Sequence, residues 1–161
     1  MPERSVTHAT FAIERTYDAS PARVFAAWAD PAAKAKWFGD ESKANYRLDF
    51  RVGGREFNRG GPPGGAVYTY EALYQDIVPD QRIVYSYSMD LDETRISVSV
   101  ATVELRPEGA GTRLTFTEQG AFLDGKEQPD WRVQGTGDQL DALAAELAGG
   151  AQVPGDGGTR G

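Results

Sequence analysis

One segment near the C-terminus, residues 130–147, is the only long amphipathic stretch of this chain. Val133, Leu140, Leu143 and Leu147 recur at steps of seven, three and four, the spacing of one helix face. The polar residues fall mainly on the other side: Arg132, Gln139, Asp141 and Glu146. At 1.5 Å per residue such a helix is roughly 27 Å long. Because almost everything before it has the pattern of strands, we expect one helix to close over one sheet.

Composition narrows the classes of protein that the chain can belong to. Its 161 residues suit a single domain with a sizeable core, since 40% of them are hydrophobic. The net charge of −7 repels phosphate backbones and disfavours nucleic acid as a partner. The sequence has no cysteine, which excludes disulfides, thiol catalysis and cysteine-ligated metal. No His or carboxylate cluster has the spacing of metal ligands, so we predict neither a metal nor a cofactor.

Targeting signals are not evident in the sequence. The first residues, MPERSVTHATF, contain no apolar core of a signal peptide. No apolar run approaches the roughly 20 residues that a membrane helix needs. We therefore expect a cytoplasmic protein without a membrane partner.

The first third of the chain predicts a strand followed by two short helices. Residues 11–17 alternate as a strand does. Ser20-Pro21 and Asp30-Pro31 each combine an N-cap residue with a proline suited to the first helical position. The second helix is expected to carry Lys34 and Lys36 outward. Two tandem helices resemble a DNA-binding shape, but the basic residues that DNA binding requires are too few.

Residues 46–119 predict about six more strands joined by short turns, which favours an antiparallel meander. The clearest alternation covers residues 46–52. In residues 95–106 the apolar positions change parity, which predicts a bulge near Ala101-Thr102 or a bend where burial changes face. The predicted strands cover residues 46–52, 55–59, 67–78, 83–89, 95–106 and 114–119.

Tyrosines concentrate on these predicted strands. A buried Tyr has an apolar body and a hydroxyl that needs a partner, so several facing one interior would line a largely apolar pocket with a few polar groups. The alternative is ordinary strand packing, because Tyr is a good strand residue. The tyrosines concerned are Tyr46, Tyr68, Tyr70, Tyr74, Tyr85 and Tyr87.

Ionisable residues give little support for catalysis. The single histidine, His8, lies near the N-terminus, so a Ser-His-Asp triad is disfavoured and a surface position is expected. Glu71 and Glu104 fall within predicted strands, and we expect both at the surface. We therefore name no catalytic residue.

Several short motifs, in order, resemble one known family. They are Ser20-Pro21 with Val24-Phe25 and Trp28, Pro31 with Trp37-Phe38-Gly39, residues 49–54 (DFRVGG), residues 70–85 and 111–115, and Gly135-Thr136 with Leu140 and Leu143. Together, over residues 8–148, the chain resembles the START-like (SRPBCC, helix-grip) superfamily. Within it, the chain is similar to the bacterial branch related to the activator of heat-shock-protein-90 ATPase.

The resemblance implies an α+β helix-grip fold. A curved antiparallel sheet of about six or seven strands would wrap around the long C-terminal helix, with two short helices after the first strand. Residues 1–148 would form one domain and residues 149–161 a flexible tail. Gly135 and Gly137 each cost about 1 kcal/mol in a helix, and Thr136 with Gln139 resembles a capping box. The last helix therefore starts near Thr136 or near Asp130, and the resemblance favours the earlier start.

The family fold also implies a hydrophobic cavity between sheet and helix. We expect it to bind a small, mostly apolar molecule, lipid-like or aromatic and polyketide-like. The alternatives are an enzyme of the polyketide cyclase/dehydratase type and a chaperone ATPase activator, and a homodimer and a chaperone partner stay open. The predicted cavity residues are Trp37, Phe38, Phe50, Tyr68, Tyr70, Tyr74, Tyr85, Tyr87, Trp131, Val133, Thr136 and Leu140.

Overall fold

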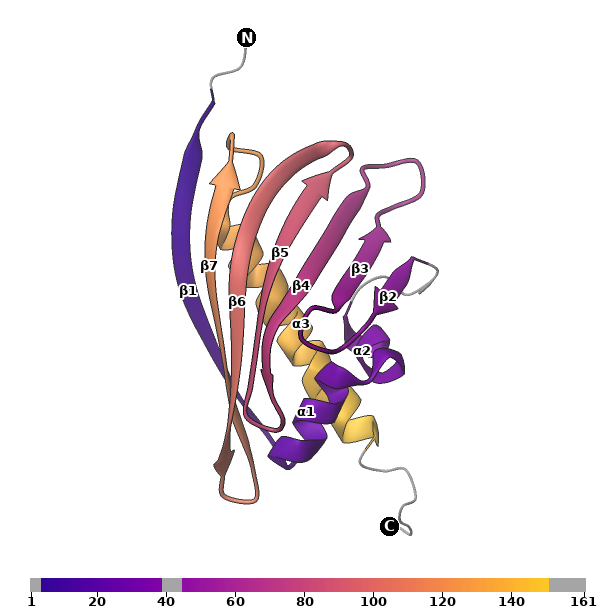
Figure 1. Cartoon of the computed structure of the whole chain (residues 1–161), viewed down its shortest axis with the longest axis vertical. Coiled ribbons are helices and arrows are strands. Elements are labelled where there is room, and N and C mark those ends of the chain that lie inside the picture. The colour runs from indigo at the N-terminus through magenta and orange to yellow at the C-terminus, as the bar shows by residue number, and fades with distance from the viewer. Residues whose placement is uncertain (1–3, 39–44, 151–161) are drawn as a thin grey trace.

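The computed structural model, which describes residues 4–38 and 45–150, contains one curved, fully antiparallel sheet. Its seven strands lie in the order β1-β7-β6-β5-β4-β3-β2. The helix-grip prediction is confirmed, including the two short helices after the first strand (Figure 1). The strands are β1 (Val6–Tyr17), β2 (Tyr46–Leu48), β3 (Arg55–Gly60), β4 (Tyr68–Val78), β5 (Arg82–Leu91), β6 (Thr94–Glu108) and β7 (Gly111–Leu123).

The two short helices, α1 (Pro21–Ala29) and α2 (Pro31–Trp37), begin where the cap signals predicted. The Ser20 hydroxyl accepts a hydrogen bond from the Arg23 amide at 3.2 Å, and the Asp30 carboxylate accepts one from the Ala33 amide at 3.0 Å. Each cap satisfies an amide that the first helical turn leaves unpaired. Both helices lie at one end of the sheet (Figure 1).

The long helix α3 (Pro129–Gly150) is continuous and starts before the two glycines. It runs along one face of the curved sheet (Figure 1). Its C-terminal half is the packed half, where Leu140, Leu143 and Leu147 are buried. The Tyr17 hydroxyl donates to the Leu140 carbonyl at 2.9 Å and joins the helix to β1. This helix is not long and apolar enough to cross a membrane, and neither is any other helix within residues 4–38 and 45–150.

Two local strand predictions are wrong. The strand expected over residues 46–52 ends at Leu48, because the chain turns: the Gly54 amide donates to the Arg51 carbonyl at 2.7 Å, and Gly53 has a φ of 85°. The bulge in β6 lies at Ile96, between the pairs Met89↔Ser97 and Asp90↔Arg95. Beyond it the register is regular, so no bulge occurs near Ala101-Thr102.

The consequence for β6 is an inner face that is partly polar. Ser97 and Ser99 are buried, whereas Val98 and Val100 are 46% and 41% exposed on the outer face. The alternation therefore continues without a parity change from Ser97 onward, and the valines mark the wrong face. Ser97 is inward because its hydroxyl accepts a hydrogen bond from a charged side chain of α3, whereas the Ser99 hydroxyl has no partner among the described residues. The predicted domain, residues 1–148, and the predicted flexible tail, residues 149–161, stay predictions. Residues 151–161 and Gly39 lie outside the residues that the structure describes.

Replacing Gly135 by alanine tests the continuous helix. An added Cβ at this position would meet nothing within 4 Å, so Gly135→Ala is expected to raise the free energy of unfolding by about 0.5–1 kcal/mol. At Gly137 the Cβ would lie 3.3 Å from Arg15 Nη2, so Gly137→Ala should gain less. Urea unfolding measures both. A loss of stability in Gly135→Ala would contradict a regular helix here.

Candidate functional site

A cavity of about 470 Å³ lies between the inner face of the sheet and the first half of α3. This volume is within the range of small-molecule sites. Its walls come from α1 and α2, strands β3, β4, β5 and β7, and α3. Trp131 and Tyr68, which are 63% and 47% exposed, lie where it meets solvent. Nine of its lining residues are aromatic: Trp28, Trp37, Phe38, Tyr68, Tyr70, Tyr85, Tyr87, Phe116 and Trp131.

Most of the residues predicted for the cavity do line it. They are Trp37, Phe38, Tyr68, Tyr70, Tyr85, Tyr87, Trp131, Thr136 and Leu140. The period-2 alternation brings the strand tyrosines to one face, and the 3.6-residue period does the same on α3. The role of these residues in binding a ligand remains a prediction.

Three predicted lining residues lie elsewhere. Tyr74 is buried behind the cavity wall, where its hydroxyl donates to Glu56 at 2.7 Å. Phe50 packs edge-on against Phe25 and Tyr74, with ring centroids 5.6 and 5.0 Å away. Val133 is half-buried on α3 but lies about a third of a turn from the middle of the lining helix face. Tyr74 and Phe50 lie outside because the cavity is toward the start of α3, and Val133 lies outside because it is on another face of that helix.

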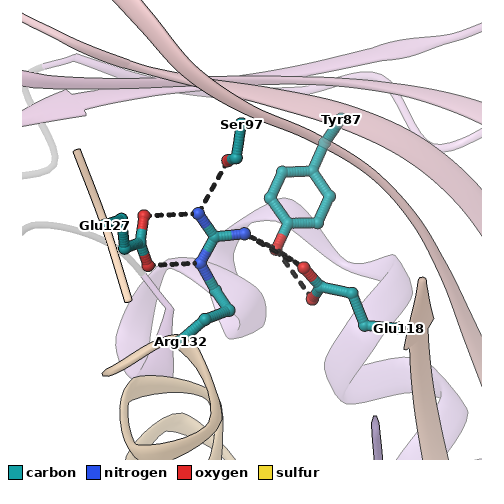
Figure 2. Close-up of polar contacts among 5 residues, drawn as sticks. All are labelled: Tyr87, Ser97, Glu118, Glu127 and Arg132. Carbon is teal, nitrogen blue, oxygen red and sulfur yellow. Dashed lines mark hydrogen bonds and ion pairs between the residues drawn. The ribbon is translucent and has the colours of Figure 1, made fainter. Parts of the chain in front are cut away.

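Arg132, in the first turn of α3, is the centre of a polar network beside the cavity (Figure 2). Its Nη1 donates to the Tyr87 hydroxyl at 2.8 Å and to Glu118 at 3.0 Å. Its Nη2 donates to the Ser97 hydroxyl at 2.7 Å and to Glu127 at 2.7 Å, and its Nε donates to Glu127 at 2.9 Å. All five N–H groups of the guanidinium therefore have acceptors.

The Arg132 network joins the start of α3 to three strands. Tyr87 lies on β5, Ser97 on β6 and Glu118 on β7, and the Tyr87 hydroxyl also donates to Glu118 at 2.8 Å. Burial, followed by the Glu118 carboxylate, raises the pKa of Tyr87. Arg132 itself is only 6% exposed, although the helix pattern predicts it on the polar side. Ser97 faces inward because it accepts from this guanidinium.

A second buried network lies behind the aromatic wall. The Lys34 ammonium lies 2.9 Å from Glu56, and both side chains have no solvent exposure. The same carboxylate accepts from the hydroxyls of Tyr46, Tyr70 and Tyr74 at 2.6, 3.3 and 2.7 Å. The prediction that Lys34 points outward is wrong. The sequence does contain a signal for burial. Lys34 lies three residues before Trp37 and therefore on the same helix face, and Trp37 is also buried.

Comparison with known proteins identifies the family. The model of the family described as "Activator of Hsp90 ATPase homolog 1-like protein" matches residues 18–148. The chain belongs to this family. The resemblance drawn from the short motifs is thereby confirmed.

Solved structures of this fold agree with the family assignment. A Rhizobium leguminosarum protein is 47% identical, with a TM-score of 0.87 over 91% of this chain and 98% of its own. Mll3558 from Rhizobium loti is 54% identical, with a TM-score of 0.85 over 88% and 99%. CV1439 from Chromobacterium violaceum is 27% identical, with a TM-score of 0.70 over 86% and 96%. No curated protein matches the chain.

In this member of the activator-of-Hsp90-ATPase-like family, the cavity offers few groups for acid-base chemistry. Among the described lining residues, Glu127 and Arg132 are the ionisable ones apart from the tyrosines, and they are paired at 2.7 Å. Burial raises the pKa of the Tyr70, Tyr85 and Tyr87 hydroxyls, so these remain neutral. Glu71 is exposed and Glu104 only half-buried. The described residues contain no cluster of His, Cys, Asp or Glu able to hold a metal ion.

Proposed function

We propose that this protein binds a small, mostly apolar molecule in the cavity between sheet and α3. The observation that carries the proposal is a cavity of about 470 Å³ with nine aromatic side chains in its wall. Burying apolar ligand surface against such a wall is favourable by roughly 25 cal/mol per Å². The family fold, which commonly encloses hydrophobic ligands, supports this reading.

The shape of the molecule supports the same proposal. The C-terminal half of α3 packs tightly through Leu140, Leu143 and Leu147, whereas its first half is held mainly by the Arg132 network. The cavity lies beside this first half of α3, next to the Arg132 network, and leaves space there that a ligand can fill. The charged groups beside this space are paired with each other and need no ligand to satisfy them.

Tryptophan fluorescence gives a direct binding assay. The protein has three tryptophans, and Trp28, Trp37 and Trp131 all line the cavity. Titration with fluorene, a neutral tricyclic hydrocarbon, should quench this emission saturably, and calorimetry should give a dissociation constant on the order of micromolar. Absence of both signals with every apolar compound tried would overturn the proposal.

A filled cavity gives the matched control. Thr136 is 7% exposed and lines the cavity, so Thr136→Phe should weaken fluorene binding at least about tenfold by occupying the space. Ala142 is exposed on the same helix and away from the cavity, so Ala142→Phe should leave binding unchanged. Equal affinity in the two variants would place the ligand elsewhere.

Two other functions are alternatives with less support. A cyclase or dehydratase would need an ionisable side chain free to act in the cavity, and apart from tyrosines the described lining offers only the paired Glu127 and Arg132. A chaperone ATPase activator would need a contiguous exposed apolar patch. The exposed large apolar residues of the described chain are divided between Trp131 and Tyr68 at the cavity mouth and four valines, Val6, Val52, Val98 and Val100. A homodimer and a cytoplasmic location remain predictions.

A further inference from the structure

Strand β2 is one edge of the sheet, and β3 is its only neighbour among the described strands (Figure 1). The Asp49 amide donates to the Arg55 carbonyl across this pair at 2.9 Å. Because hydrogen-bonded and non-bonded positions alternate along an antiparallel pair, the peptide groups of Tyr46 and Leu48 point away from β3. Peptide groups that point outward from an edge can pair with a further strand.

A groove of about 640 Å³ lies between this edge and α2. Its helix wall consists of Pro31, Ala32 and Ala35, and its sheet wall includes Tyr46 and Leu48. The small side chains of α2 leave room for a chain segment next to β2. Side chains alternate between the two faces of a strand, so a strand added to β2 would direct every second side chain into this groove.

Three arginines beside the groove have no acceptor among the described residues. Arg47 on β2 and Arg55 and Arg59 on β3 are exposed, and none of them forms an ion pair or a side-chain hydrogen bond there. Every other described arginine has such a partner. The nearby Asp49 is paired with Arg51 at 2.9 Å. In a chain with a net charge of −7, this group of cations is therefore available to an acidic partner.

The three arginines share the outer face of the sheet around Phe57. Arg47 is opposite Phe57 in the register of β2 and β3, and its guanidinium carbon lies 4.7 Å from the centre of that ring. Arg55 and Arg59 lie two residues to either side of Phe57 and so on the same face. Glu71, opposite Phe57 on β4, forms no ion pair with these arginines. The outer side of this edge is therefore positively charged.

We propose that the edge of β2 is a docking site for an extended acidic segment of another protein. The segment adds to β2 as a further strand, and its backbone bonds to the peptide groups of Tyr46 and Leu48. Its side chains alternate: small apolar ones enter the groove beside α2, and carboxylates lie on the outer face beside Arg47. The cavity between sheet and α3 takes no part, so this inference is independent of the proposed function.

A fluorescently labelled peptide of alternating glutamate and valine tests the proposal on the full-length chain. Fluorescence anisotropy should give a dissociation constant of about 10–100 μM at a salt concentration of about 50 mM. Binding should be several-fold weaker at about 300 mM salt, because salt screens exposed charges. A peptide with lysine in place of glutamate, and a glutamate peptide methylated on its backbone nitrogens, should each bind at least about tenfold more weakly.

Matched variants assign the binding to the edge of β2. Arg47→Glu replaces an attraction by a repulsion and should weaken binding of the glutamate peptide about tenfold. Arg106→Glu changes an arginine on β6 whose side chain is 73% exposed, and it should alter binding less than about twofold. Ala32→Phe fills the groove and should also weaken binding about tenfold, whereas Ala142→Phe on α3 should not. The melting temperature of each variant shows that it is folded.

The outcomes are distinct. Equal binding of the glutamate and lysine peptides overturns the recognition of charge, and equal binding of the methylated peptide overturns strand addition. A single-stranded oligonucleotide that binds more tightly than the glutamate peptide makes nucleic acid the partner and overturns the proposal. So does the absence of peptide binding, or an equal effect of Arg47→Glu and Arg106→Glu. Loss of fluorene binding with peptide binding retained would contradict the proposed function alone.

Discussion

Replacing Lys34 by methionine should lower the free energy of unfolding by about 3–5 kcal/mol, the typical cost of leaving one charge of a buried pair uncompensated. The Lys34 ammonium lies 2.9 Å from Glu56, and neither side chain is exposed. It also donates to the Tyr74 hydroxyl at 3.2 Å and lies 4.5 Å from the centre of the Phe38 ring. Methionine keeps the apolar stem and leaves the Glu56 carboxylate without its cation. Urea unfolding at neutral pH measures the change.

Lys36 provides the control on the same helix. Its side chain is 60% exposed and lies 3.8 Å from Glu146, so Lys36→Met should change stability by less than about 1 kcal/mol. The double variant Lys34→Met/Glu56→Gln removes both charges and keeps an acceptor for the tyrosine hydroxyls, so it should recover much of the loss. A Lys34→Met protein as stable as the Lys36→Met protein would contradict the buried pair.

The same lysine shows where sequence reasoning reached its limit. The strands, the two capped helices and the long helix follow from local signals, because side-chain periodicity and cap chemistry act within a few residues. The same periodicity predicts the lining tyrosines. A charged side chain predicts exposure, and for Lys34 and Arg132 that prediction is wrong. Their partners Glu56 and Glu118 lie on strands distant in sequence.

The inner face of β6 shows how a local apolar pattern and a contact between distant elements can conflict. Apolarity alone assigns Val98 and Val100 to the core, yet Ser97 and Ser99 are the buried residues. Ser97 is inward because the Arg132 guanidinium, from a helix 35 residues later, donates to its hydroxyl. No local pattern contains that contact, because it depends on how α3 lies over the finished sheet.

The buried tyrosines lead to a second large effect, a steep loss of stability in alkali. Burial is the main cause that raises the pKa of each buried tyrosine. For the four tyrosines on β4 and β5, nearby carboxylates or other tyrosines raise the pKa further. In the unfolded chain a tyrosine ionises near pH 10. The tyrosines concerned are Tyr17, Tyr70, Tyr74, Tyr85 and Tyr87, all at most 7% exposed.

The direction of this pH effect follows from which state holds more protons. Below pH 10 both states keep their phenol protons, so the stability from these groups is fully present. Above pH 10 the unfolded chain releases protons that the folded protein retains, and each tyrosine then lowers the free energy of unfolding by about 1.4 kcal/mol per pH unit. Burial lowers the pKa of Lys34, which has the opposite effect, but it is a single group.

Five tyrosines together should therefore lower stability by several kcal/mol at about pH 11, comparable with the whole 5–15 kcal/mol of a typical domain. We expect cooperative unfolding between about pH 10 and pH 11, with the tyrosinate absorbance rising together with the loss of circular dichroism. Urea unfolding at intervals of half a pH unit gives the slope directly. If the absorbance instead rose fully while the circular dichroism stayed native, the tyrosines would be ionising within the fold. The aromatic wall would then be open to water, which also contradicts a cavity suited to an apolar ligand.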